Sequence, residues 1–203
     1  MPTRCGAIET ALALVNNAGI GVSSPGREVS AAGFELRFAV NYLAGFLLTR
    51  LLLPALEGVE SARIVNVASA GQQPIDFSDV MLTRGYSGAR AYRQSKLAQI
   101  PFTFDLAKEL SGRNITANCL HPATFMDTTM VRLSGVQPIS TVEQGGEAIL
   151  QLIESPALAD RSGLYFSGMH EARADPQAYD QDARRRLRAL SFGLVGIADR
   201  LFA

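Results

Sequence analysis

The sequence predicts an α/β fold built from parallel βαβ units, and three observations lead to this prediction. Short apolar runs typical of buried strands alternate with helical patterns of ten or more residues, as expected for parallel strands joined by crossover helices. The 203 residues are 47% hydrophobic and 19% charged, an ordinary balance for a protein with a hydrophobic core. No composition shift, internal repeat or low-complexity tract marks a second domain, so residues 1–203 are interpreted as one domain.

The first predicted strand and helix occupy the first quarter of the chain. Residues 11–15 (ALALV) form a continuous apolar run that closes at the polar and glycine residues 16–19, which indicates a buried strand followed by a turn. Helical periodicity then runs over residues 28–53. Ser30 is the expected cap of this helix, and Pro54 is expected to stop it.

A second strand, a loop, a long helix and a third strand follow. Residues 63–68 (RIVNVA) are β-branched and bounded by turn residues, which predicts a strand. Residues 72–88 are turn-rich and are interpreted as a loop. Residues 89–110 predict the second long helix, and residues 114–120 (NITANCL) predict a strand that stops before Pro122.

The last part of the chain predicts two helices and one short strand. Thr141 is the expected cap of a helix over residues 141–153, which has Glu and Gln in its first turn. Residues 163–166 predict a short strand. Residues 175–190 predict a final helix with Pro176 at its first position, where proline is tolerated.

Composition excludes several functional classes. The formal net charge is zero, which gives no reason to expect nucleic acid as a partner. Cys5 and Cys119 cannot form a framework of several disulfides, so a reducing, cytoplasmic location is expected. The longest apolar stretch, residues 45–56, is interrupted by Arg50 and Pro54 and is expected to be too short to span a membrane.

Tyr92 and Lys96 form the pair that suggests chemistry. They stand four residues apart in a predicted helix, a spacing that places both side chains on one face. A phenol ordinarily titrates near pH 10, and a neighbouring ammonium lowers that pKa. The pair could therefore donate or accept a proton for a carbonyl/alcohol couple. Taken alone it is a weak signal, because helices also carry such pairs as a solvated aromatic beside a surface lysine.

The pair lies within an ordered series of motifs. The series comprises NNAG at 16–19, VN at 40–41, VASAG at 67–71, AYRQSK at 91–96 and LHPAT at 120–124. In this order, each at the end of a predicted strand or within a predicted helix, the motifs resemble the short-chain dehydrogenase/reductase superfamily. The match extends from about residue 11 to about residue 170. The long interval between Ser69 and Tyr92 resembles the retinol-dehydrogenase-like branch.

The resemblance assigns roles to individual residues. It implies that Tyr92 is the acid/base, that Lys96 depresses the pKa of Tyr92 and holds the nicotinamide ribose, and that Ser69 hydrogen-bonds the substrate oxygen. Asn41 would support a water-linked proton relay to Lys96. The residues that would contact NAD or NADP, besides Tyr92 and Lys96, are Asn17, Ala18, Gly19, Pro122 and Thr128. Without this context, Asn41 could be a locally bonded helix residue and Ser69 an ordinary turn serine.

The resemblance also implies a Rossmann-like, doubly wound parallel sheet in a three-layer αβα arrangement, here lacking the first βαβαβα part. The family normally begins with a strand, a T-G-x-x-x-G-x-G turn and two further βα units. Residues 1–10 are too few for these, because one βαβ unit needs about 30 residues. A misplaced start codon, a truncated gene and a short paralogue are the competing explanations. We expect residues 1–203 to form a partial NAD(P)-binding domain that binds cofactor weakly or not at all and exposes the edge of its first strand.

Other features receive non-functional interpretations. The sequence Gly19-Ile20-Gly21 follows a strand but does not complete the dinucleotide fingerprint. His121 and His170 have no acidic or cysteine partner at ligand spacing, so no metal site is expected. The arginines at 184–188 are interpreted as a solvated helix face rather than a phosphate or membrane site. Alanine follows Pro122 where the family has glycine, and Thr128 falls one residue later than the family's phosphate-contacting threonine.

Three functions remain open. The first is an NAD(P)-dependent oxidoreductase that interconverts an alcohol and a carbonyl compound, with a hydrophobic substrate held by the loops at 72–88 and 125–138. The second is a catalytically inactive fragment that acts only as a binding or dimerising protein. The third, an epimerase or dehydratase of the extended branch, is disfavoured because little sequence follows Leu164 for a substrate domain. A homodimer or homotetramer is expected, with the helix after Ala89 as a contact, since family members usually dimerise through it.

Overall fold

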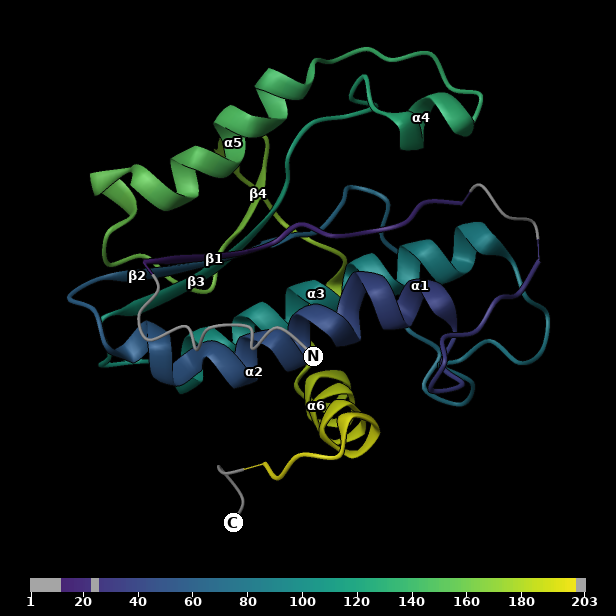
Figure 1. Ribbon diagram of the computed structural model, residues 1–203, viewed down its shortest axis with the longest axis horizontal. Helices are drawn as coiled ribbons and strands as arrows, with labels where there is room; N and C mark the ends of the chain where they lie inside the picture. Colours follow the sequence, from purple (N-terminus) through teal and green to yellow (C-terminus); the bar gives the residue numbers. More distant parts are fainter. Residues whose placement is uncertain (1–11, 23–25, 200–203) are drawn as a thin grey trace, which may run out of the picture.

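The structure, a computed structural model, describes residues 12–22 and 26–199 and is organised around a five-stranded sheet (Figure 1). The strands follow one another in the sheet in the order β1-β2-β3-β4-β5. The first four are parallel, and β5 runs antiparallel to β4. The strands are β1 Ala13–Asn16, β2 Ala62–Val67, β3 Ile115–His121, β4 Tyr165–Ser167 and β5 His170–Glu171. The predicted parallel order is confirmed for four strands; the two-residue antiparallel edge was not predicted.

Helices cover both faces of this sheet, which confirms the predicted three-layer arrangement. In Figure 1, α1, α2 and α3 lie below the sheet, and α5 lies above it. The helical segments are α1 Leu36–Phe38, η1 Ala39–Leu43, α2 Ala44–Glu57, α3 Gly88–Glu109, α4 Thr129–Leu133, α5 Val142–Glu154, η2 Pro156–Leu158, η3 Pro176–Tyr179 and α6 Gln181–Val195.

Two hydrophobic clusters hold the layers together. The larger lies between the sheet and α2, α3 and α6, and includes Phe46, Leu97 and Ile100. The smaller packs Leu152 of α5 against residues of β2, β3 and β4. Because every residue of β3 is buried, this strand lies at the centre of the core, as expected for a parallel strand covered on both faces.

The first long helix differs from its prediction at both ends. It begins at Leu36 rather than residue 28, because Ser30 forms a turn with Phe34 and the side chain of Glu35 caps the helix at the Phe38 amide, 2.7 Å away. At the other end the helix passes through Pro54 and ends at Glu57. The fixed φ of proline is compatible with a helix, and the full burial of Leu56 anchors the last turn against the core.

The same stretch bears on the question of a membrane span. Among the described residues, one helical stretch, Leu36–Glu57, is long and apolar enough to cross a membrane by length and composition, with 39% of its most apolar window buried. The prediction that no segment reaches this length was therefore wrong. A core helix of a soluble protein meets the same criterion, and this one places Asn41 and Phe46, each 1% exposed, inside the protein.

The second long helix agrees with its prediction. The side chain of Ser87 caps α3 at the Arg90 amide, and the helix continues through Pro101 to Glu109. On the other face, α5 begins with the predicted Thr141 cap, which forms a reciprocal capping box with Gln144.

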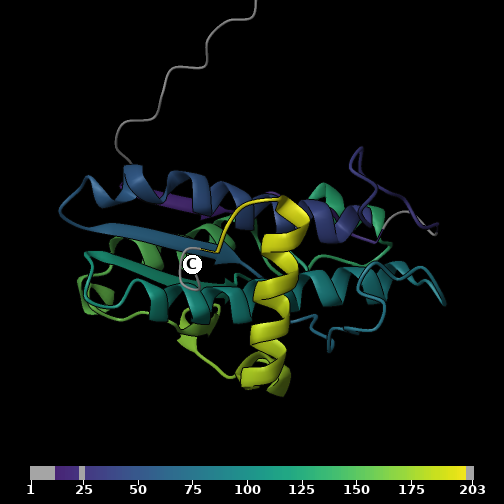
Figure 2. The ribbon, with the colours of Figure 1, turned by 90° about the horizontal axis from the view of Figure 1, so that it is seen from below.

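The final helix is shorter than predicted and begins later. Pro176 opens the 3-10 turn η3 instead, and the Asp180 side chain caps α6. Figure 2 shows α6 crossing α2 and α3 on the side away from the sheet, where Ser191 hydrogen-bonds the Tyr42 hydroxyl at 2.7 Å. Most of α3 is buried within this one chain, where α6 packs against it, and the dimer contact through α3 stays a prediction.

The arginines of α6 are engaged within the protein rather than solvated alone. Arg184 pairs with Asp105, and Arg188 pairs with Glu109 and Asp199. Arg185 pairs with Asp182, and the Arg186 guanidinium lies 4.7 Å from the centre of the Phe77 ring. The interpretation of this cluster as a solvated helix face was therefore wrong for Arg184 and Arg188, because both are largely buried in ion pairs with other parts of the chain.

Candidate active site

Ser69 and Tyr92 meet at the carboxyl end of β2. Ser69 follows the strand by two residues, and its hydroxyl accepts a hydrogen bond from the Gly71 amide at 3.0 Å. Tyr92 lies in the first turns of α3, and a Cβ placed on Gly71 would lie 3.5 Å from Ser69 Oγ and 3.6 Å from Tyr92 Cε1, so the two side chains border the same small space. Burial raises the pKa of Tyr92 above its usual value near 10, and the nearby Ser69 side chain opposes that rise. The phenol is therefore neutral at physiological pH.

Lys96 lies one helical turn further along α3 and is 5% exposed. Its ammonium donates to the carbonyl of Val67, the last residue of β2, at 2.8 Å, and to Gln99 Oε1 at 3.5 Å. Burial lowers the pKa of Lys96 to about 8. The group beside Tyr92 that lowers its pKa is Ser69, and the depression of this pKa by Lys96 stays a prediction. The lysine itself is held by the end of β2.

Asn41 lies in the π-helical turn η1, between α1 and α2. Its Oδ1 accepts from the Ile20 amide at 2.7 Å, and its Nδ2 donates to the Ile20 carbonyl at 3.1 Å and to Ser95 Oγ at 2.9 Å. Single π turns within helices occur frequently at functional sites, because they re-aim a side chain. Here the turn aims Asn41 so that it joins the loop after β1 to the helix that carries Tyr92 and Lys96.

Gly19 brings the loop after β1 against Lys96. A Cβ placed on Gly19 would lie 3.3 Å from Asn41 Oδ1 and 3.5 Å from Lys96 Nζ. The absence of a side chain therefore leaves room beside the ammonium. Asn17 and Ala18, the neighbouring residues of the predicted cofactor loop, are exposed at the same edge.

The other two predicted cofactor residues lie on the far side of this edge. Pro122 directly follows β3 and is buried. Thr128 has a structural role that the motif comparison did not predict. Its hydroxyl accepts a hydrogen bond from the Val131 amide at 3.4 Å and caps α4. Met130 of α4 lies against Gly21, where its Cγ would be 2.7 Å from an added Cβ. We call residues 125–139, which include α4, the flap.

A buried polar network beneath the site was missed by the sequence analysis. Asn16 donates to Thr49 Oγ1 at 2.9 Å and to Asn66 Oδ1 at 2.7 Å, and Asn66 donates to Thr103 Oγ1 at 2.8 Å. These side chains connect β1 and β2 to α2 and α3. A polar residue inside an apolar strand, such as Asn66 in RIVNVA, was the available signal.

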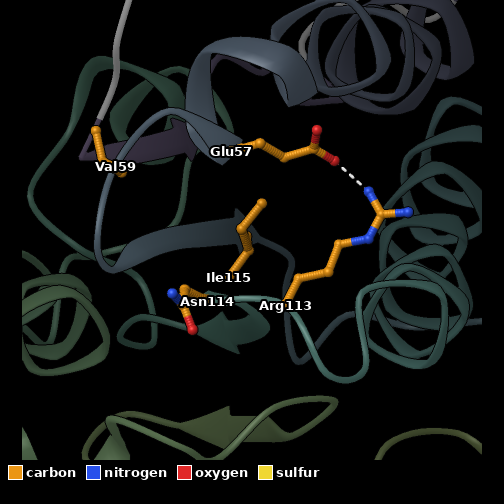
Figure 3. A pocket seen from close by; sticks show the side chains of 5 residues that line it. All are labelled: Glu57, Val59, Arg113, Asn114 and Ile115. Carbon is orange, nitrogen blue, oxygen red and sulfur yellow. Dashed lines mark hydrogen bonds and ion pairs between the residues drawn. The ribbon is translucent and has the colours of Figure 1, made fainter.

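Hollows elsewhere do not coincide with this site. One of about 410 Å³, lined by Glu57, Val59, Arg113, Asn114 and Ile115, lies at the amino ends of β2 and β3, opposite the catalytic side chains (Figure 3). An ion pair between Glu57 and Arg113 closes one side of it. Among residues 12–22 and 26–199, no group of three or more His, Cys, Asp or Glu side chains is placed to hold a metal.

Comparison with known proteins gives a family match. The model of the family described as short chain dehydrogenase matches residues 7–137. Human retinol dehydrogenase 13 is 37% identical over 202 residues, covering 91% of this chain and 60% of the relative. Human retinol dehydrogenase 14 is 36% identical, covering 91% and 58%. The chain therefore spans about three fifths of the length of these relatives.

Solved structures give a consistent result. An uncharacterized protein from Mycobacterium paratuberculosis superposes with a TM-score of 0.70 at 27% identity, covering 93% of this chain and 68% of that one. The 3-ketoacyl-(acyl-carrier-protein) reductase from Brucella melitensis, solved with NADH, superposes with a TM-score of 0.59 at 25% identity, covering 78% and 65%.

Proposed function

The chain belongs to the short chain dehydrogenase family, and we propose that it interconverts an alcohol and a carbonyl compound with NAD or NADP as the hydride carrier. The observation that carries this proposal is the arrangement at the carboxyl end of β2, where the Ser69 hydroxyl and the Tyr92 ring both border Gly71 and Lys96 is buried one turn away. The similarity of the chain to retinol dehydrogenases supports the retinol-dehydrogenase-like branch, which the long interval between Ser69 and Tyr92 had predicted.

Tyr92 transfers the proton in this proposal. Its raised pKa keeps the phenol protonated at neutral pH, so in the reduction direction it can donate a proton to the carbonyl oxygen as hydride arrives. Ser69 donates a hydrogen bond to the same oxygen and stabilises the charge that develops on it. In the oxidation direction the phenolate is the required base, so that direction gains rate as pH rises.

Lys96 and Asn41 prepare the site for this transfer. With a pKa of about 8, Lys96 is mostly charged at pH 7, and its ammonium stabilises the phenolate that remains after Tyr92 has given up its proton. Asn41 fixes the loop after β1 through both groups of the Ile20 backbone. The water-linked relay from Asn41 to Lys96 stays a prediction.

The residues fit the nicotinamide end of the cofactor. The space left by Gly19 lies 3.5 Å from the Lys96 ammonium, a position suited to the hydroxyls of a ribose. The bound cofactor would supply the hydride, a chemistry that no side chain of the protein provides. Thr128 is not assigned to this contact, because its hydroxyl caps α4.

The substrate proposed is hydrophobic, and the structure favours one of the two predicted loops. In the loop at 72–88, Leu82 is 1% exposed, and Phe77 and Met81 pack on the core, so these side chains stabilise the fold. The flap is different, since Phe125 is 47% exposed and Leu133 is 67% exposed. Apolar groups at the carboxyl ends of parallel strands suit a hydrophobic alcohol or carbonyl compound.

The test is an assay of NADH and NADPH oxidation by the 203-residue chain with hydrophobic aldehydes and ketones and, separately, small charged ketones. Turnover with the hydrophobic set is expected, and Ser69→Ala lowers it by about 10²-fold. Ser61→Ala, at an exposed serine, serves as the control. Turnover only with small charged ketones would contradict the substrate class, and no turnover with any compound would favour the inactive alternative.

A further inference from the structure

Two charged side chains are buried at the start of α1, away from the catalytic residues. Glu35 and Arg37 are each 1% exposed, and Arg37 Nη1 lies 3.6 Å from Glu35 Oε1. Removing charges from water is costly unless hydrogen bonds satisfy them. The hydrogen bonds that satisfy Glu35 and Arg37 come from two loops of the protein.

Arg37 holds the loop after β1. Its Nε donates to the carbonyl of Gly21 at 2.8 Å. Gly21 lies two residues beyond Gly19 and next to Ile20, which Asn41 holds. The guanidinium therefore fixes the end of the loop that faces the proposed cofactor position.

Tyr86 brings a second loop to the same pair. Its hydroxyl accepts from Arg37 Nη1 at 2.6 Å and donates to Glu35 Oε1 at 3.2 Å. Tyr86 lies just before α3 begins, at the end of the loop at 72–87. One hydroxyl thus bridges the two charges and ties this loop to the loop after β1.

The same loop is held at a second point. The Glu35 amide donates to the Met81 sulfur at 3.4 Å, and Arg27 Nε donates to the Met81 carbonyl at 3.0 Å. The next residue, Leu82, is buried with a positive φ of 48°. Such a conformation is unfavourable for leucine and persists only where the surroundings determine it.

We propose that the Glu35–Arg37–Tyr86 cluster couples the loop after β1 to the loop at 72–87, so that Arg37 and Tyr86 are positioning residues for the reaction. The kinetic consequence rests on the proposed function; the coupling itself does not. Because both loops share one buried pair, ordering either loop lowers the cost of ordering the other. A cofactor bound against the loop after β1 would then order the loop at 72–87 as well.

Hydrogen–deuterium exchange of the purified chain tests the coupling without activity. Tyr86→Phe keeps the ring, and Glu35 and Arg37 are close enough to pair directly, so the variant is expected to fold with a cooperative melt. The amides of residues 79–86 should lose about tenfold in protection, and those of Ile20–Val22, across the site, should lose protection with them. Tyr179→Phe, which removes a hydroxyl that accepts from the Ala174 amide, should change neither segment.

Arg37→Lys provides a second variant, because it keeps the charge but not the forked contact with Gly21 and Tyr86. It should deprotect the same two segments. Two results would overturn the coupling. One is a loss of protection in Tyr86→Phe that is confined to residues 79–86. The other is unchanged protection of both segments in both variants.

Kinetics provide the second measurement. In an active preparation, Tyr86→Phe should raise KM for the nicotinamide cofactor about tenfold and leave kcat within about twofold, because the loop after β1 faces the proposed cofactor position and Tyr86 does not contact the reacting atoms. A fall in kcat with unchanged KM would contradict the positioning role. If the wild-type chain shows no turnover at all, the proposed function fails while the exchange experiment still decides the coupling.

Discussion

The proposed catalytic end of the sheet buries polar side chains, whereas the outer face of β1 and α2 exposes apolar side chains. At the catalytic end, polar groups are inside: Asn41, Ser95 and Lys96 are at most 5% exposed. On the outer face, apolar groups are outside: Leu12 is 71% exposed and Leu51 is 64% exposed. Buried polar groups and exposed apolar groups are the informative exceptions in a folded protein, since the first indicate chemistry and the second indicate contact.

The two regions therefore differ in how completely contacts within the chain satisfy their side chains. Asn41, Ser69 and Lys96 each have a hydrogen-bond partner within the protein, such as the Val67 carbonyl for Lys96. Among the described residues, β1 pairs only with β2, and the other edge of β1 has no strand beside it. The catalytic end is therefore internally satisfied, whereas the outer face is suited to a further contact.

The largest effect is expected from Lys96→Met. This substitution removes a buried charge and keeps the volume of the side chain nearly unchanged. Turnover should fall by about 10²- to 10⁴-fold, because the phenolate of Tyr92 loses its neighbouring cation. Stability should change in the opposite direction. The pKa of Lys96 is about 8 in the folded chain against an ordinary 10.5, so charging it at pH 7 opposes folding by about 3 kcal/mol.

The sign of this pH dependence can be checked directly. Between pH 8 and pH 10.5 the unfolded chain binds the Lys96 proton and the folded chain does not, so the stability of the wild type rises with pH across that range. Lys96→Met should be more stable than the wild type at pH 7, and its advantage should shrink towards pH 10.5. Denaturant melts across this range measure it, and a variant that is less stable at every pH would refute the account of a costly buried charge.

A smaller effect is expected beneath the site, where Asn66 bridges Asn16 and Thr103. Asn66→Ala should lower the free energy of unfolding by about 1–2 kcal/mol, because it removes two buried hydrogen bonds, while Asn16 keeps its bond to Thr49 and Thr103 keeps its bond to the Gln99 carbonyl. Asn114→Ala, at an exposed position, should cost less than about 0.5 kcal/mol. Urea melts decide the matter, and equal losses in the two variants would show that the network does not stabilise the fold.

The loop after β1 allows a finer test through Gly19→Ala. The added methyl would press on Asn41 and occupy the space beside Lys96, so cofactor affinity should fall about tenfold with a stability loss of about 1 kcal/mol. Gly26→Ala is the matched control, because nothing lies within 4 Å of its added Cβ. Calorimetry with NADH and NADPH measures both variants; unchanged affinity in Gly19→Ala would remove this glycine from the cofactor site.

The smallest effect on stability belongs to the outer face. Leu51→Glu should change the free energy of unfolding by less than about 0.5 kcal/mol, because the side chain already faces solvent. It should reduce self-association in sedimentation velocity, whereas Leu133→Glu, equally exposed but on the flap, should not. Association that is unaltered by Leu51→Glu would exclude this part of the α2 face as its cause.

The sequence predicted features that depend on local geometry and missed those that depend on packing. The helix that carries Tyr92 and Lys96 follows from the spacing of its residues, and the capping of α5 by Thr141 follows from a local pattern. The hydrogen bond of Lys96 to the Val67 carbonyl, and its lowered pKa, depend on how closely α3 packs against the end of β2. No local pattern encodes that distance.

Two local contacts were not predictable from the pattern. The first long helix was given too early a start because the turn at Ser30 carries apolar residues at helical spacing, while the stabilising cap is Glu35. The short helix α4 was not predicted, and its cap is the Thr128 hydroxyl, whose assignment to the cofactor stays a prediction. In both cases a side chain accepts a hydrogen bond from a nearby backbone amide that the pattern could not reveal.

The central claim is that Tyr92 is the proton donor of an alcohol/carbonyl oxidoreductase. The most direct measurement compares kcat of the wild type and Tyr92→Phe on the same carbonyl substrate and cofactor, together with their thermal melts. Phenylalanine keeps the ring and removes only the hydroxyl, so kcat should fall by about 10³-fold while the melting temperature stays within a few degrees. A Tyr92→Phe variant with the fold intact and kcat within tenfold of the wild type would contradict the claim.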